Sequence, residues 1–487
     1  MRGYAGRIWL ITAVGLAWRL ALLGYQPLWR DEAFTALAVQ RSLGSMLDVV
    51  RHDSAPPLFY LLERAVAIVS TSPVALRLVP VLAGAAAIPI MAALGRRVAG
   101  DAGGIWAAVI GAVAPVLAVS SLDARMYILA TALVLGSTLC LLRALERPSM
   151  LRWALYVGVS VLAVYTVYFA LFAVLGQVVA VAVLSRRRHF GTTVLVAGLS
   201  AATVASLAPW VVVARTQLSH GAGGFWVPKL NIVSLSGGLV QFFIGSPVNS
   251  WVTGYVVLRT LEGACIVAGV IALVALVVRR RSLEARGVQA ASLLGLSAAV
   301  AVAIMVLVSF WHPLEDGRYL GAAWAPAFPL VGAGLATLPW RRVAAGAAAV
   351  LALVTLATVT TVTNPDTPAA IADLERVVGP HDVIAAYPSE YLLVLYYGDN
   401  AVDARTHSMA TVVPWYWGTA VYPASAVLRA MPMASSNAPN VWYVFQPGDP
   451  APPDPDGYTA RSTRCWTGVC VTMLSPSGLG AAATHST

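Results

Sequence analysis

Long apolar stretches follow one another along most of this chain, separated by short polar loops. A helix needs roughly 20 apolar residues to cross the hydrocarbon core of a bilayer. The hydropathy pattern predicts such spans near residues 8–24, 75–95, 103–121, 126–145, 152–168, 169–185, 191–213, 252–278, 288–310, 319–338 and 343–363. We therefore expect a polytopic α-helical membrane protein with about 11 transmembrane helices. Because many spans follow the first one, it is not a cleaved signal peptide.

The segment between the first two spans, residues 25–73, is rich in charged residues, among them Asp31, Glu32, Asp53 and Glu63. Its apolar run at 57–70 could be taken for another span. That choice would reverse every later loop and place the arginine clusters outside the cell. We therefore predict an outside loop with two helices near the membrane interface.

The arginine clusters orient the chain, because basic loops stay on the cytoplasmic side. They lie at Arg96-Arg97, Arg186-Arg187-Arg188, Arg279-Arg280-Arg281 and Arg341-Arg342. The amino terminus is then cytoplasmic, and the acidic residues near Asp31, Asp53, Asp123 and Glu315 gather on the outer face. This pattern predicts a multi-pass protein of the plasma membrane.

The tail has a different pattern, so we separate a transmembrane domain, residues 1–363, from an extracytoplasmic domain, residues 364–477. Helical periodicity at 369–378 and near 391–397 alternates with strand-like runs at 383–387 and 441–445, which predicts a small α/β domain. Residues 478–487 are small and polar, and we expect them to be disordered. Cys465 and Cys470 are predicted to form a disulfide, with Gly468 permitting the turn between them.

Composition narrows the class of protein. The chain has 487 residues, of which 59% are hydrophobic and 11% charged, too apolar for one soluble core. The formal net charge of +10 comes from arginines in the loops, so it does not indicate nucleic-acid binding.

The outer face combines carboxylates, arginines and aromatic residues, a set that suits glycosyl transfer. A carboxylate can deprotonate an acceptor hydroxyl, and guanidinium groups can hold a phosphate leaving group. A polyprenyl-phosphate sugar is a natural donor, since its lipid tail can stay in the bilayer.

A series of short motifs then occurs in a recognisable order. After Arg19 they occupy residues 28–33, 52–60, 75–77, 121–127, 209–228 and 317–320. In this order they resemble the C-type superfamily of polytopic glycosyltransferases, specifically the glycosyltransferase family 39 type that includes protein mannosyltransferases and lipid A aminoarabinose transferases. The chain departs from its relatives at Thr166-Val167-Tyr168, which lacks a histidine, and at Ser54-Ala55, which lacks an acidic-basic pair.

The resemblance implies residue roles. Asp31 would be the general base, positioned by Glu32, and Arg318 would hold the donor phosphate across from it. Substrate-binding residues would include Asp123, Arg125, Tyr319, His52, Asp53 and Trp226. The alternatives are a helix-opening acid pair for Asp31 and Glu32, a snorkelling side chain for Arg318, a structural ion pair for Asp123 and Arg125, and an interfacial aromatic for Trp226.

His52 and Asp53 also raise the question of a metal site, but two residues are too few to build one. We expect no required cofactor, with a divalent metal as the alternative.

The resemblance favours an inverting enzyme that moves mannose from a polyprenyl phosphate to a cell-envelope glycolipid, polysaccharide or protein. Arabinofuranose is the alternative sugar. A lipid or solute transporter would be expected to show an internal repeat and charges in mid-span, and neither is evident. A non-catalytic scaffold would tolerate replacement of Asp31.

Overall fold

The computed structural model describes residues 2–185, 190–215, 217, 227, 230–231, 255–312, 314, 317–339, 341–361, 364–403, 405–409, 418–422, 426–427, 438–449 and 457–477. Contacts divide the chain into two compact units. Unit 1 comprises Met1–Gly24 and Val50–Val362, and unit 2 comprises Tyr25–Val49 and Thr363–Thr487. Part of the predicted outside loop therefore shares a unit with the tail.

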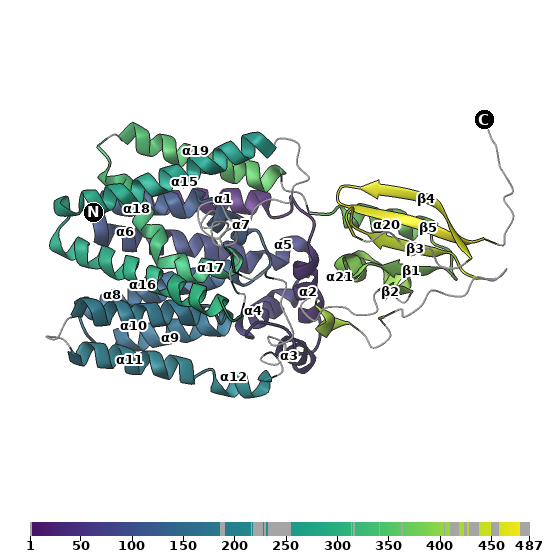
Figure 1. Ribbon diagram of the computed structural model, residues 1–487, viewed down its shortest axis with the longest axis horizontal. Coiled ribbons are helices and arrows are strands. Elements are labelled where there is room, and N and C mark those ends of the chain that lie inside the picture. Colours follow the sequence, from purple (N-terminus) through teal and green to yellow (C-terminus); the bar gives the residue numbers. More distant parts are fainter. Residues whose placement is uncertain are drawn as a thin grey trace. The chain divides into compact units, whose positions relative to one another are not determined.

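Unit 1 is helical (Figure 1). Its elements are α1 (Arg2–Leu22), α4 (Leu58–Ala67), α5 (Pro73–Leu76), α6 (Leu78–Val113), α7 (Pro115–Ser121), α8 (Tyr127–Glu146), α9 (Met150–Thr166), α10 (Ala170–Ser185), α11 (Phe190–Ala205), α12 (Ala208–Val213), α15 (Tyr255–Val278), η2 (Arg280–Ser282), α16 (Ala285–Ser309), α17 (Gly317–Trp324), η3 (Ala325–Ala327), α18 (Phe328–Thr337) and α19 (Arg341–Thr361). The short helix α3 (Leu43–Arg51) contains the boundary between the units.

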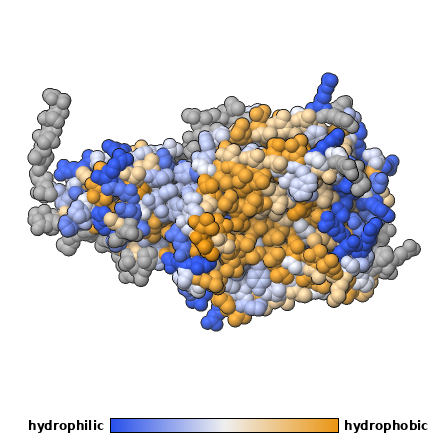
Figure 2. Space-filling view, turned by 180° about the vertical axis from the view of Figure 1, so that it is seen from behind, coloured by the Kyte–Doolittle hydropathy of each residue, from blue (hydrophilic) through white to orange (hydrophobic). Residues whose placement is uncertain are grey.

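Within the described residues, 7 helical stretches are long and apolar enough to cross a membrane, and three shorter apolar helices accompany them. The predicted polytopic fold is thus confirmed, whereas the number of about 11 spans stays a prediction. Figure 2 shows hydrophobic residues over a broad part of the helical surface. Large apolar side chains of unit 1, such as Leu10, Leu155 and Leu353, are exposed. Such a surface suits contact with lipid tails. The run at 57–70 forms only the 10-residue helix α4, about half the length that a span needs.

Helix α6 is two helical segments that meet at Gly100, whose φ of 65° is open to glycine without strain. The segments pack closely, because a Cβ at Gly95 would lie 2.6 Å from the carbonyl oxygen of Gly103. This helical pair corresponds to the predicted spans at 75–95 and 103–121, and the arginine pair Arg96-Arg97 lies just before the turn.

The Arg96-Arg97 pair and the acidic turn at residues 123–125 lie at opposite ends of α8. At one end the Arg97 side chain pairs with Glu146 at 2.8 Å, Arg96 stacks over Tyr4, and Gly287 of α16 approaches Val98. At the other end, residues 123–125 precede the first residue of the helix. The orientation predicted from the arginine clusters requires basic and acidic residues to lie at opposite ends of the helices, as they do here. Which end faces the cytoplasm stays a prediction.

Arg19 is a fully buried cation in the first helix. Its guanidinium donates to the Ser121 hydroxyl at 3.2 Å and to the backbone carbonyls of Gly15, Gly111 and Ala112 at 2.9, 3.0 and 3.1 Å. Because these acceptors include groups of α6 and α7, the Arg19 side chain links α1 to both helices. The structure thus shows a packing role for the first residue of the motif series.

Unit 2 is built on a five-stranded sheet in the order β2-β1-β3-β5-β4 (Figure 1). Its strands are β1 (Val383–Ala386), β2 (Thr406–Ser408), β3 (Val441–Phe445), β4 (Tyr458–Trp466) and β5 (Val469–Pro476). β1 is parallel to β2 and β3, while β5 is antiparallel to β3 and β4. Its helices are α2 (Arg30–Val39), α20 (Thr367–Val377), α21 (Pro388–Tyr397), α22 (Asn400–Asp403) and η5 (Thr419–Val421).

The predicted α/β tail domain is confirmed, and α20, β1, α21 and β3 correspond to the four segments expected from sequence. The β4–β5 hairpin was not expected. Most residues of β4 are exposed, so the strand lacks the alternation of buried and exposed positions that marks a strand in sequence.

The predicted disulfide is confirmed at the end of this hairpin. Cys465 and Cys470 are bonded and face each other as partners in the β4–β5 ladder. Gly468 adopts a φ of 72°, as the predicted turn requires. Residues 478–487, expected to be disordered, lie outside the described residues.

Candidate active site

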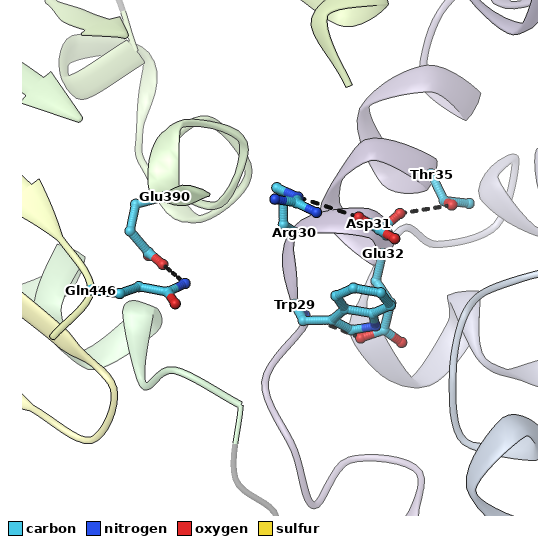
Figure 3. Close-up of polar contacts among 7 residues, drawn as sticks. All are labelled: Trp29, Arg30, Asp31, Glu32, Thr35, Glu390 and Gln446. Atoms are coloured by element: carbon cyan, nitrogen blue, oxygen red, sulfur yellow. Dashed lines mark hydrogen bonds and ion pairs between the residues drawn. The ribbon is translucent and has the colours of Figure 1, made fainter. Parts of the chain in front are cut away.

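Asp31 and Glu32 open helix α2 in unit 2, but their environments differ (Figure 3). Glu32 is fully buried and accepts a hydrogen bond from the Trp29 backbone N–H at 3.2 Å, the reciprocal contact of a capping box. The Asp31 side chain is 21% exposed and lies 3.3 Å from the Nε of Arg30. The helix-opening role therefore belongs to Glu32, and the Asp31 carboxylate remains accessible.

The loop before α2 is held by residues far along the chain. The Tyr397 hydroxyl accepts a hydrogen bond from the Leu28 N–H at 2.7 Å, and Asn364 binds the Pro27 carbonyl at 2.8 Å. Helix α2 also packs against α21. The position of Asp31 within unit 2 is thus set by the tail.

A buried carboxylate, Asp53, is the centre of a second polar group, in unit 1. Asp53 is 8% exposed and accepts a hydrogen bond from the Tyr60 hydroxyl at 3.0 Å. Burial first, and then the Asp53 charge, hold the pKa of Tyr60 well above its ordinary value, while Arg125 acts in the opposite direction. Tyr60 is therefore a neutral hydrogen-bond donor at physiological pH.

A separate chain of hydrogen bonds ends at the backbone near Asp53. The Tyr168 hydroxyl donates to Gln217 at 2.6 Å and accepts from the Trp210 indole at 2.9 Å. Gln217 in turn donates to the Val50 carbonyl at 2.7 Å, which braces the backbone just before Asp53.

Aromatic rings flank the same group. The ring of Tyr319 lies 6.1 Å from that of Tyr127 and 4.8 Å from that of Phe169. Arg125, which is 6% exposed, precedes Tyr127 in the turn where its backbone N–H contacts the Asp123 carbonyl at 2.6 Å. We call Asp53, Tyr60, Arg125, Tyr127, Tyr168 and Tyr319 the Asp53 cluster.

The structure distributes the predicted site residues over both units. Asp53, Arg125 and Tyr319 belong to the Asp53 cluster, with His52 and Asp123 adjacent in sequence, whereas Asp31 and Glu32 belong to unit 2. Arg318 lies in the first turn of α17, beside Tyr319, and Trp226 lies outside the described residues. The roles of all these residues stay predictions.

The sequence reasoning did not single out some residues that the structure connects to these groups. Four of them lie within or beside the recognised motifs, and this position is the sequence feature that could have identified them. They are Tyr60, Tyr168, Trp210 and Gln217. Glu390 of α21, described below, had no such signal.

Among the residues that the structure describes, no group of three His, Cys, Asp or Glu side chains could hold a metal ion.

Residues 53–212 match the family described as dolichyl-phosphate-mannose-protein mannosyltransferase. Among solved structures, ArnT from Cupriavidus metallidurans bound to undecaprenyl phosphate is similar, with 14% identity, a TM-score of 0.56, and coverage of 96% of this chain and 98% of that chain. AglB, an archaeal oligosaccharyltransferase from Archaeoglobus fulgidus in complex with an inhibitory peptide and a dolichol-phosphate, is similar with 12% identity, a TM-score of 0.52, and coverage of 81% and 63%. No curated protein matches the chain.

The chain is similar to polytopic glycosyltransferases of the family 39 type. The structural likeness, at this low identity, shows the C-type fold, and the family match covers residues 53–212, less than half of the chain. The resemblance drawn from the motifs is thereby confirmed. Five of the six residues of the Asp53 cluster lie within the match, namely Asp53, Tyr60, Arg125, Tyr127 and Tyr168, and Trp210 lies there too.

Proposed function

We propose that this protein is an inverting glycosyltransferase that transfers one sugar from a polyprenyl phosphate to an acceptor hydroxyl at the outer face of the membrane. Two observations support the donor class. ArnT was solved with undecaprenyl phosphate and AglB with a dolichol-phosphate, and the matching family is named after dolichyl-phosphate-mannose. That family name also favours mannose, with a cell-envelope glycolipid, polysaccharide or protein as acceptor.

The observation that carries the assignment of the base is the difference between the two adjacent carboxylates. Glu32 is buried and engaged in capping α2, whereas Asp31 is accessible beside Arg30. A general base must reach the proton that it removes. Asp31 meets that requirement, and Glu32 positions it by fixing the first turn of the helix.

The proposed reaction is a single in-line displacement. The acceptor oxygen bonds to the anomeric carbon as the bond from that carbon to the phosphate oxygen breaks, and the hydroxyl proton passes to Asp31. Arg318 stabilises the leaving phosphate by charge-assisted hydrogen bonds. The lipid phosphate keeps the electron pair of the broken bond.

The Asp53 cluster suits recognition of a polar ligand. It offers the Arg125 cation, a buried carboxylate and neutral tyrosine hydroxyls, next to the rings of Tyr127 and Tyr319. Such donors and aromatic faces contact sugar hydroxyls and phosphate oxygens in complementary ways. We assign Asp53, Arg125 and Tyr319 to substrate binding on this basis. For His52, Asp123 and Trp226 the assignment rests on the motif resemblance alone.

The test is transfer by the purified full chain in detergent or vesicles. Labelled polyprenyl-phosphate mannose and polyprenyl-phosphate arabinofuranose are each supplied with envelope glycolipid acceptors. Labelled product from the mannose donor is expected. Product only from arabinofuranose would change the sugar, and movement of the intact donor across vesicles without transfer would support a transporter instead.

A further inference from the structure

A buried acid from the tail, Glu390, lies in the same unit as Asp31. It is the third residue of α21, it is fully buried, and α21 packs against α2. Its two carboxyl oxygens accept separate hydrogen bonds, one from the Gln446 side chain at 2.5 Å and one from the Thr367 hydroxyl at 2.9 Å. The side chain is thus held in one orientation by two neutral partners.

Figure 3 shows Arg30 between the two acids, on the side of α2 where Glu390 and Gln446 lie. The Nε of Arg30 is 3.3 Å from Asp31, and the Arg30 charge also acts on Glu390, where it lowers the pKa. The same cation therefore lies beside the accessible Asp31 carboxylate and acts through its charge on the buried Glu390.

We propose that Glu390 is a positioning residue for the transfer reaction: by drawing on the Arg30 guanidinium, it sets how strongly that cation engages the Asp31 carboxylate. A cation beside a carboxylate stabilises its charged form and weakens it as a base. When Glu390 is ionised it competes for Arg30, so Asp31 becomes a stronger base. This inference rests on the proposed role of Asp31.

Glu390 changes its protonation state near neutral pH. Burial raises its pKa to about 7, the Asp449 charge adds to this effect, and the hydrogen bonds from Gln446 and Thr367 and the Arg30 charge oppose it. Because the pKa is raised, Glu390 is protonated below about pH 7 and ionised above it. Asp31 should therefore become a stronger base as the pH rises through 7.

Several charged groups lie on the elements around α21. Those that act on Glu390 are Arg30 of α2 and Asp449 after β3. The titratable or charged residues of α20, α22 and β2 are Asp373, Glu375, Arg376, Asp403 and His407. Of these, Asp373 is paired with Arg464 and Arg376, and Asp403 acts on Tyr391.

The test measures kcat and KM for donor and acceptor from pH 5.5 to 9. In the native protein, kcat should rise about threefold to tenfold around pH 7, the size of coupling expected within one charge network. Glu390→Gln should remove the rise and keep kcat near the low-pH value, with KM unchanged. The substitution preserves shape, since the Thr367 hydroxyl can accept as well as donate. Glu390→Asp should restore part of the pH dependence.

Arg30→Gln supplies an independent arm, because Arg30 is partly exposed and its loss should not prevent folding. This variant should lose the inflection near pH 7 although Glu390 is present. The matched control is Asp382→Asn, which neutralises another buried acid of unit 2 that is bound by Asn440 and Trp442. It should keep the native pH profile.

An inflection that survives in Glu390→Gln or in Arg30→Gln overturns the inference. If Glu390→Gln does not fold, the Arg30→Gln profile decides. Failure of the proposed function is recognised separately, since Asp31→Asn would then transfer sugar at a near-native rate. An inactive Asp31→Asn variant together with a native-like Glu390→Gln profile would refute only the role of Glu390.

Discussion

The two acidic groups of this protein are built in opposite ways. Asp53 is buried and bonded to a tyrosine hydroxyl, and its cluster comes mainly from residues 50–217 of unit 1. Asp31 is accessible beside a cation, and its surroundings in unit 2 combine residues 27–32 with residues 364–446. A buried, hydrogen-bonded carboxylate is a fixed acceptor, whereas an accessible one can take up a proton. This difference supports our proposal that Asp31 performs the chemistry and that the Asp53 cluster binds substrate.

The largest effect is expected at Asp31. Asp31→Asn keeps the size of the side chain and removes the base, so kcat should fall by about 10²- to 10⁴-fold with little change in donor affinity. Single-turnover transfer and donor binding, measured on the same preparation, test this. Asp382→Asn is the matched control, because it neutralises another acid of unit 2, one that is bound by Asn440 and Trp442. Near-normal transfer by Asp31→Asn would make Asp123 the next candidate for the base.

Arg318 should show the opposite kinetic signature. Arg318→Ala removes a charge-assisted partner of the phosphate and should raise the donor Kd by about 10- to 100-fold, corresponding to about 1.5–3 kcal/mol for a hydrogen bond to a charged group. Titration with polyprenyl phosphate alone measures this loss. Arg342→Ala, in a predicted cytoplasmic loop, is the control. Unchanged donor affinity in Arg318→Ala would favour the snorkelling alternative.

Replacement of Tyr60 tests whether the Asp53 cluster binds substrate or only stabilises the fold. Tyr60→Phe leaves the buried Asp53 carboxylate without this hydrogen bond, at a cost of about 1–3 kcal/mol in the free energy of unfolding. If the cluster binds substrate, KM should rise more than kcat falls. Thermal unfolding and steady-state kinetics separate the two effects, and a lowered melting temperature with native KM would assign the cluster to folding alone.

The smallest effect is expected from chelation. A polyprenyl monophosphate carries less charge than a diphosphate, so arginines can neutralise the leaving group without a divalent ion. Transfer measured after EDTA treatment should equal that of untreated protein. Activity that is lost with EDTA and restored by added Mg²⁺ or Mn²⁺ would reveal a metal requirement and bring His52 and Asp53 back as ligand candidates.

Much of the fold followed from the sequence alone. Spans were predictable because each must be apolar over most of its length, and helices such as α8 and α16 correspond closely to their hydropathy peaks. The Cys465–Cys470 pair was predictable because the bond closes a short local loop around Gly468. The motif order, from residues 28–33 to 317–320, was sufficient to indicate the enzyme family.

Tertiary structure decided what local patterns do not contain. Asp31 and Glu32 are adjacent and chemically similar, yet packing buries one and leaves the other accessible, which sequence spacing does not encode. The β4 strand exposes most of its residues, so its pairing with β5 leaves little hydropathy signal. Glu390 is an ordinary acidic residue in sequence, and only the folding of α21 against α2 places it within the influence of Arg30. Apolar periodicity is local and can be read from neighbouring residues, whereas burial, charge coupling and hydrogen-bond geometry depend on partners hundreds of positions away.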